Sequence, residues 1–129
     1  MCYKRFDEKK PFLEAEKHCI RQGGHLARIS SEIENEFVGQ IGGREKFWIG
    51  FWTGNESKCS TDKNKYVWTD GSLNTGFNHW RGSGPDCYGS QYGRAAFFNW
   101  NGTNNLWGDG QISWPIPFVC GKSREQLGI

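Results

Sequence analysis

The residues best suited to acid–base or nucleophilic chemistry are three histidines and five cysteines, and their spacing forms no catalytic pattern. His18 falls within an expected helix and His25 begins an expected strand, and neither has a partnered nucleophile beside it. His79, Asp86 and Cys87 offer zinc-binding atoms, but at a spacing that fits no known zinc motif, and there is no Cys-x-x-Cys pair. No glycine-rich phosphate loop lies between a strand and a helix. We therefore expect no enzymatic activity.

A second group of residues suits recognition. Arg81, Tyr88, Tyr92 and Arg94 lie in or beside a long segment without clear periodicity. Aromatic rings stack on the C–H faces of sugars and are common hot spots in protein interfaces. Arginine binds carboxylates or sulfates through two parallel hydrogen bonds. We interpret these four side chains as candidate ligand-binding residues.

The composition is typical of an extracellular recognition domain. We expect one domain spanning residues 1–129, with upstream sequence missing and no signal peptide. The chain has 16 basic and 14 acidic residues, a balance that does not indicate nucleic-acid binding. No apolar run approaches the roughly 20 residues of a membrane span. Five cysteines and two glycan acceptor sequons, at Asn55 and Asn101, favour a secreted protein or the extracellular part of a membrane protein.

The first forty residues predict helix, short strand, helix. A helix is expected from Pro11 to Gln22, ended by Gly23-Gly24, and residues 25–29 read as extended. A second helix follows Ser31, whose side chain is expected to form a capping box with Glu34. Each helix shows an apolar face. These faces comprise Phe12, Ala15, Cys19 and Ile20 in the first helix, and Ile33, Phe37 and Ile41 in the second.

The remainder of the chain predicts short strands around a long loop. Strands are expected at residues 47–51, 66–68, 94–100 and 117–122, with Trp107 between the last two. Residues 73–92 form the long loop, which is rich in Gly, Asn and Ser. Loops of this length within compact domains are usually functional or disordered, and the aromatic rings within this loop argue against disorder.

Several short motifs occur in an order and spacing that resembles the C-type lectin-like domain. They are Cys2-Tyr3, Pro11 to Glu16 with Cys19, Gly24 to Ala27, Ser31 to Phe37, Trp48 to Phe51, Trp68 to Gly71, Phe77, Trp80, Trp107, and Phe118 to Cys120. The resemblance implies an α+β fold, with two helices flanking small antiparallel sheets and a long loop region. It also implies that Trp80 belongs to the core.

The resemblance also implies a disulfide framework. Cys19 is expected to pair with Cys120, joining the first helix to the last strand. The second bond of many family members would fall at Ala95 and Ile112, where both cysteines are absent. Two further cysteines, Cys59 and Cys87, lie in neighbouring loops, and we predict that they pair, although other connectivities remain open. Cys2 is then left over.

Sugar-binding members of the family hold calcium at the long loop through a Glu-Pro-Asn or Gln-Pro-Asp triplet, a further acid, and an Asn-Asp pair. The matching positions here are Gly84-Pro85-Asp86, Gly93-Arg94 and Gly108-Asp109. Pro85 is expected to follow a cis peptide bond. Asp86 and Asp109 remain as candidate calcium ligands, whereas calcium takes 6–8 oxygens. A different calcium site using Glu56, Asp62 and Asp70 is an alternative, so calcium is possible and no cofactor is certain.

We therefore expect a non-enzymatic recognition domain whose ligand face comprises residues 73–93 and 101–110. The leading hypothesis is carbohydrate or glycoconjugate binding with an eroded calcium ligand set. The alternative is calcium-independent binding of an extracellular protein by the same face, and a display scaffold with variable loops is a third interpretation. The candidate contacts are Arg81, Asp86, Tyr88, Tyr92, Arg94 and Asp109. The oligomeric state is left open.

Overall fold

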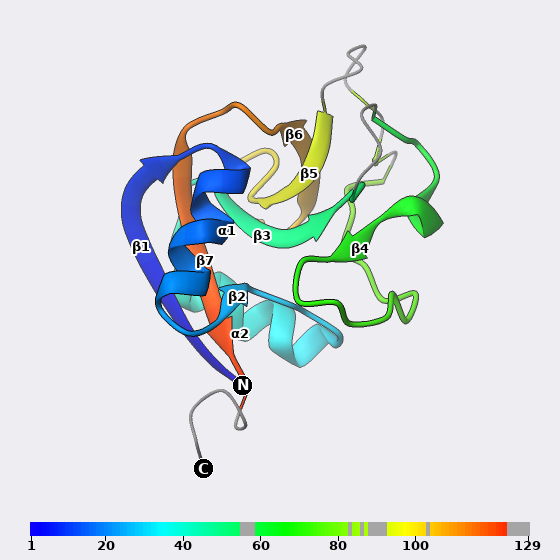
Figure 1. Cartoon of the computed structure of the whole chain (residues 1–129). Helices are drawn as coiled ribbons and strands as arrows, with labels where there is room; N and C mark the ends of the chain where they lie inside the picture. Colours follow the sequence, from blue (N-terminus) through cyan, green and yellow to red (C-terminus); the bar gives the residue numbers. More distant parts are fainter. Residues whose placement is uncertain (55–58, 83, 86, 88–92, 103, 124–129) are drawn as a thin grey trace.

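The computed structural model describes residues 1–54, 59–82, 84–85, 87, 93–102 and 104–123 (Figure 1). The order of elements matches the predicted sequence of two helices followed by strands around a long loop. The elements are β1 (Cys2–Lys10), α1 (Phe12–Arg21), β2 (His25–Leu26), α2 (Glu32–Gly42), β3 (Phe47–Trp52), a 3₁₀ turn (Lys63–Lys65), β4 (Val67–Trp68), β5 (Gly93–Phe98), β6 (Trp107–Gln111) and β7 (Ile116–Lys122). No helix of the described residues is long and apolar enough to cross a bilayer.

The strands form one mixed sheet in the order β1-β7-β3-β5-β6, with β2 added to β7 and β4 to β3. All pairs are antiparallel except β3 with β7, which meet in parallel at Trp48 and Phe118. The α+β class is therefore confirmed, and the expected small antiparallel sheets are joined by the β3–β7 contact. Each helix packs beside this sheet, and the N-terminal strand lies along the C-terminal one (Figure 1).

Strand β1 is longer than the Cys2-Tyr3 segment that the family resemblance suggested. It pairs with β7 from Cys2 opposite Lys122 to Phe6 opposite Phe118, and the register then shifts before Lys10. Its charged sequence lacks the alternation that marks a half-buried strand, so the sequence alone did not show its length. The pairing makes β7 a central strand and β1 an edge strand.

The predicted Cys19–Cys120 disulfide is present, across a sequence separation of 101 residues. It joins α1 to β7 within an apolar cluster that also contains Phe12 and Trp48. In the chain-entropy model, closing a loop of this size removes about 4–5 kcal/mol of conformational freedom from the unfolded chain. Ala95 and Ile112, at the positions of the absent second bond, belong to the same cluster, so apolar packing occupies that region.

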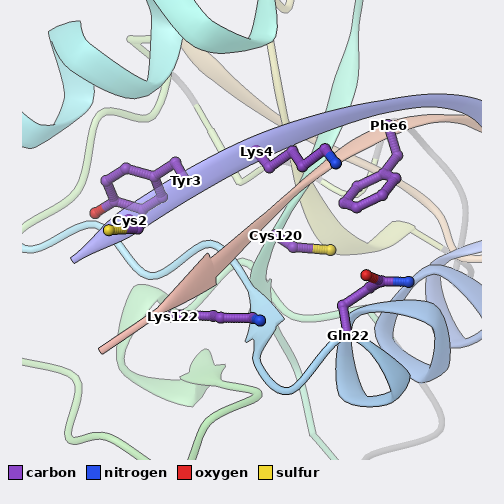
Figure 2. Close-up of a pocket in the computed structure, with 7 residues that line it drawn as sticks. All are labelled: Cys2, Tyr3, Lys4, Phe6, Gln22, Cys120 and Lys122. Atoms are coloured by element: carbon purple, nitrogen blue, oxygen red, sulfur yellow. The ribbon is translucent and has the colours of Figure 1, made fainter. Parts of the chain in front are cut away.

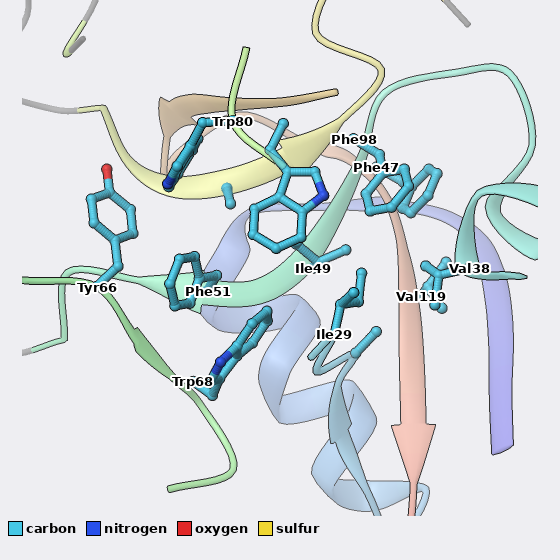
Figure 3. Close-up of a cluster of buried hydrophobic side chains, with 13 residues drawn as sticks. Ile29, Val38, Phe47, Ile49, Phe51, Tyr66, Trp68, Trp80, Phe98 and Val119 are labelled. Carbon is cyan, nitrogen blue, oxygen red and sulfur yellow. The ribbon is translucent and has the colours of Figure 1, made fainter. Parts of the chain in front are cut away.

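A second apolar cluster fills the opposite face of the sheet, and Figure 3 shows Phe51, Trp68 and Trp80 within it. Trp107 belongs to the same cluster. The Trp107 indole makes edge contacts with Phe51, Trp68 and Trp80 at centroid distances of 5.7, 6.0 and 5.8 Å. Edge-to-face geometry places the positive ring edge against the negative ring face, which is favourable beyond simple burial. Trp80 is buried, so the expectation that it belongs to the core is confirmed.

The apolar faces that the sequence indicates are only partly buried in both helices. In α1, Ile20 is 52% exposed, while Phe12, Ala15 and Cys19 are buried as expected. In α2, Ile33 is 80% exposed and Phe37 48% exposed.

The face that α2 buries instead consists of Asn35, Val38 and Gly42. Asn35 accepts a hydrogen bond from Trp107 Nε1 at 2.8 Å and donates to the carbonyl of Asn105 at 3.2 Å. At Gly42, a Cβ would lie only 2.2 Å from the ring of Phe47, so this contact requires glycine. Two tertiary contacts therefore decide which way the helix faces.

The predicted cap at the start of α2 is confirmed with one difference. Ser31 Oγ accepts from the Glu34 backbone N–H at 3.2 Å, as a capping box requires. The Glu34 carboxylate accepts from the backbone N–H of Ser30 at 3.0 Å, one residue before the expected donor. Both bonds satisfy amide groups at the entrance to the helix.

Replacing Asn35 by alanine is expected to destabilise the protein by about 1–3 kcal/mol, because the buried Trp107 Nε1 would lose its acceptor. The Asn105 carbonyl would lose the Asn35 donor and keep its contact with His79 Nδ1. The measurement is the free energy of unfolding in denaturant. Glu36→Ala, an exposed change on the same helix, is the matched control and should have little effect. Equal losses for the two variants would contradict the assigned role of Asn35.

Candidate functional site

Strand β6 anchors the long loop at residues 79–81. Trp80 forms an isolated bridge with Trp107, in which the Trp107 N–H donates to the His79 carbonyl at 2.8 Å and the Arg81 N–H donates to the Trp107 carbonyl at 3.0 Å. The Gly84–Pro85 peptide bond is cis, as predicted. Both residues are buried, so this part of the loop lies against the body of the domain.

The predicted Cys59–Cys87 disulfide is present and closes a sequence separation of 28 residues. It joins the segment before β4 to the long loop, which are the two neighbouring loops that the prediction named. The backbone N–H of Cys87 also donates to Asp109 Oδ2 at 2.8 Å. The loop is therefore held to β6 by a covalent bond and a hydrogen bond at the same point.

Asp109, one of the two candidate calcium ligands, is only 1% exposed. Its Oδ2 lies 3.3 Å from Cys59 Sγ, a contact rather than a hydrogen bond because a disulfide sulfur carries no proton. Ligand atoms of Cys59, Cys87 and Asp109 lie within 4.8 Å of one another, a geometry that resembles a metal site. The two sulfurs are oxidised, however, and a metal-binding cysteine must be a thiolate.

Burial also raises the pKa of the Asp109 carboxyl, and the hydrogen bond from Cys87 and the charge of Arg81 offset this only in part. A calcium ligand needs to be ionised and open to the ion. The environment of Asp109 therefore does not fit a calcium site. Its proposed partner Asp86 lies outside the described residues, and so does Glu56 of the alternative set.

Asp62 and Asp70, the other two acids of the alternative calcium set, stabilise turns through hydrogen bonds to nearby backbone amides. Asp62 Oδ1 accepts from the Asn64 N–H at 2.9 Å and caps the 3₁₀ turn. Asp70 Oδ1 accepts from the Ser72 N–H at 2.8 Å, and its Oδ2 lies 3.3 Å from Arg28 Nε. Each carboxylate thus serves local structure.

The two candidate arginines both lie over tryptophan rings. The Arg81 guanidinium carbon is 4.2 Å from the ring centroid of Trp100, and that of Arg94 is 5.6 Å from the ring of Trp52. Arg94 also donates from Nε to Thr53 Oγ1 at 3.2 Å and from Nη2 to the Gly54 carbonyl at 3.0 Å. Guanidinium groups stack favourably on indole faces, which holds both side chains in defined positions.

The site prediction did not include Trp100 or Trp52. Trp100 lies directly before the sequon at Asn101, and Asn101 is exposed. A pattern search cannot tell a surface tryptophan from a core one, and the arginine partners come from segments distant in sequence. The other predicted residues, Tyr88, Tyr92 and Asn55, lie outside the described residues.

The raised pKa of Asp109 predicts a pH dependence of stability. The folded protein keeps this proton to a higher pH than the unfolded chain, so the contribution is fully present below the ordinary value of 3.8 and is lost as pH rises through the folded pKa. Asp109→Asn removes the ionisation and retains an oxygen to accept from Cys87. We expect the variant to gain stability relative to the wild type as the pH rises above 3.8, and to gain no more once the pH exceeds the folded pKa of Asp109.

The free energy of unfolding of both proteins, measured across that range, tests this expectation. Glu36→Gln, on the exposed side of α2, is the control and should follow the wild type. If the difference in unfolding free energy between Asp109→Asn and the wild type stays constant with pH, then Asp109 has the same pKa in the folded and unfolded chain.

Removing the second disulfide with Cys59→Ser/Cys87→Ser is expected to cost about 3–4 kcal/mol, from the loop length alone. Denaturant unfolding without reductant is the measurement. The control is Cys2→Ser, because Cys2 is an exposed free thiol whose loss should leave stability unchanged. A loss below the error of the measurement would mean that the bond adds no constraint to the unfolded chain.

Residues 8–122 match the family model described as the Lectin C-type domain. Versican core protein of Homo sapiens is 31% identical over 127 residues, which cover 98% of this chain and 4% of that protein. Asialoglycoprotein receptor 1 of Rattus norvegicus is 34% identical, covering 92% of this chain and 40% of that protein. Snaclec 3 of Sistrurus catenatus edwardsii is also 34% identical, over 92% of this chain and 76% of that protein.

Solved structures share the fold. The mouse scavenger receptor C-type lectin carbohydrate-recognition domain has a TM-score of 0.78 at 27% identity, covering 95% of this chain and 90% of that one. A calcium-independent type II antifreeze protein has a TM-score of 0.79 at 21% identity, covering 95% and 85%. The chain spans only 4% of the length of the versican relatives and corresponds to one part of such proteins. On this evidence the chain belongs to the C-type lectin domain family.

Proposed function

We propose that residues 1–129 form one extracellular, non-enzymatic recognition domain, and that its ligand is a carbohydrate bound directly by side chains of the long-loop face. This face is the surface formed by residues 73–93 and 101–110, together with Trp100. Members of this family typically bind glycans or other ligands, and the family is generally non-enzymatic. Relatives of this chain include an asialoglycoprotein receptor and C-type mannose receptor 2.

The observation that carries the calcium-independent part of this proposal is the enclosure of Asp109. Its carboxylate is buried, bonded to Cys87 N–H and packed against the disulfide, so it is not presented to an ion that is shared with a sugar. Covalent and backbone contacts hold the loop at this point. Binding then depends on stacking and hydrogen bonding by protein groups.

The pair of Arg81 and Trp100 is the best-placed group for such binding among the described residues. Both side chains are half-buried, and the cation lies over the indole ring. Arginine adds affinity for acidic or sulfated sugars through its paired donors. Tyr88, Tyr92 and Asp86 remain proposed contacts on the same face.

A protein ligand at the same face is the second candidate. Tryptophan and arginine are enriched at the energetic centres of protein interfaces, so the Arg81–Trp100 pair also favours this function. The name of one relative, Snaclec 3, specifies no sugar. The two candidates share a surface and differ in the chemistry of the ligand.

A glycan array probed with calcium and then with chelator tests the proposal. We expect glycan signals that persist in chelator, and that fall about tenfold for Arg81→Ala, a loss typical of one good charged contact. Lys63→Ala, an exposed change on the 3₁₀ turn, is the control and should bind as the wild type does. Signals abolished by chelator would indicate a calcium-bridged sugar, and no signal on any glycan would favour the protein ligand.

A further inference from the structure

A hollow of about 240 Å³ lies beside the paired strands β1 and β7, near the start of the chain (Figure 2). Its wall includes Lys4 and Phe6 of β1, Cys120 and Lys122 of β7, and Gln22 directly after α1. None of these residues belongs to the long-loop face. The hollow is therefore a candidate site that does not depend on the function proposed for that face.

The strand register brings these side chains to one face of the sheet. Lys4 pairs with Cys120, and Cys2 pairs with Lys122. Residues opposite each other in an antiparallel pair share a face, and so do residues two apart along one strand. Both lysines therefore project on the same side as the Cys120 sulfur, which the disulfide to Cys19 places against α1.

Two ammonium groups border this hollow without a carboxylate between them (Figure 2). Among the described residues, no acid forms an ion pair with Lys4 or Lys122, and no acid lines the hollow. The two lysines are diagonal neighbours across the strands, which places them about 7–8 Å apart. Like charges at this separation repel each other, so an anion between them would turn repulsion into two attractive contacts.

The end of α1 holds one of the two lysines in position. Lys122 is half-buried, and its Nζ lies 3.4 Å from the position that a Cβ at Gly23 would take. Gly23 follows the last turn of α1, where the negative end of the helix dipole attracts cations. This ammonium group is therefore oriented before any ligand arrives, which lowers the entropic cost of binding.

An aromatic ring and the disulfide form the apolar part of the wall. The Phe6 ring is fixed by stacking on Phe118 at a centroid distance of 5.4 Å and by an edge contact with His18 at 4.6 Å. The side-chain amide of Gln22 makes no hydrogen bond within the described part of the chain, so it can donate to a ligand oxygen. An apolar cavity of about 150 Å³ accommodates benzene, so the hollow has room for one ring with a short substituent.

We propose that this hollow binds a small aromatic carboxylate. The carboxylate lies between Lys4 and Lys122, and the ring packs against Phe6 and the disulfide. Charge-assisted hydrogen bonds from the two ammonium groups supply the complementarity, and the Gln22 amide adds a neutral donor. A ligand with one ring and one charge should bind with a millimolar dissociation constant, because exposed ion pairs and small buried areas contribute little free energy.

A nuclear magnetic resonance titration of the whole chain with benzoate, up to about 20 mM, tests the proposal, since this range covers millimolar dissociation constants. We expect saturable shifts of the amide signals of Lys4, Gln22 and Lys122, and an affinity that falls as salt rises from about 0.05 M to 1 M. Acetate lacks the ring and benzyl alcohol lacks the charge, so each should bind at least about fivefold more weakly than benzoate.

Two charge-removing variants locate the site. Lys4→Gln and Lys122→Gln should each weaken benzoate binding about three- to fivefold, and the double variant should show no saturable shifts. Lys63→Gln, on the 3₁₀ turn and outside the hollow, is the matched control and should bind as the wild type does. Absence of saturable shifts, shifts confined to other parts of the chain, equal affinities for acetate and benzoate, or binding that both lysine variants leave unchanged would each overturn the proposal.

Discussion

The indole of Trp107 joins parts of the chain that are far apart in sequence. Its ring lies fully buried among aromatic side chains of β3, β4 and the long loop, and its Nε1 donates to Asn35 of α2. Its backbone N–H and carbonyl bond to His79 and Arg81 on either side of Trp80. The second helix, the sheet and the loop therefore share one fixed point, and a shift of this residue would move all three.

The parts of the fold that sequence could predict are those specified by local pattern. The apolar run at Trp48, the glycines after the helices and the order of the aromatic motifs predicted both helices and strands β2, β3, β4, β5 and β7 in the correct order. Strand β6 and most of β1 were not predicted. Both disulfides were also correct, one from family resemblance and one because Cys59 and Cys87 lie in adjacent loops. These features depend on neighbouring residues or on a shared framework.

The errors arose where a distant partner decides the outcome. The stripe of Ile33 and Phe37 is more apolar than the face α2 actually buries, which includes a buried asparagine and a glycine. That face is selected by Trp107, 72 residues from Asn35, and by Phe47 beneath Gly42. At the candidate site, Arg81 and Arg94 were predicted as contacts, but the tryptophans on which they stack come from other segments and were not predicted.

Asp109 matches a calcium-ligand position of the family, but here its carboxyl group bonds to the long loop. Desolvation disfavours the charged form, while the Cys87 amide and Arg81 favour it, and burial prevails. The disulfide beside it removes two sulfurs from any metal chemistry and fixes the loop. The disulfide and the Cys87 amide together hold this part of the loop to β6.

The pairing of β1 with β7 places the two ends of the domain beside each other, with Cys2 opposite Lys122 (Figure 1). A polypeptide that enters at β1 therefore leaves next to its point of entry. Such a domain can be inserted into a longer chain as a side branch, with little change to the path of the sequence on either side. Several copies strung along one polypeptide would each present a loop face to a multivalent ligand, and weak single contacts would then add up to avidity.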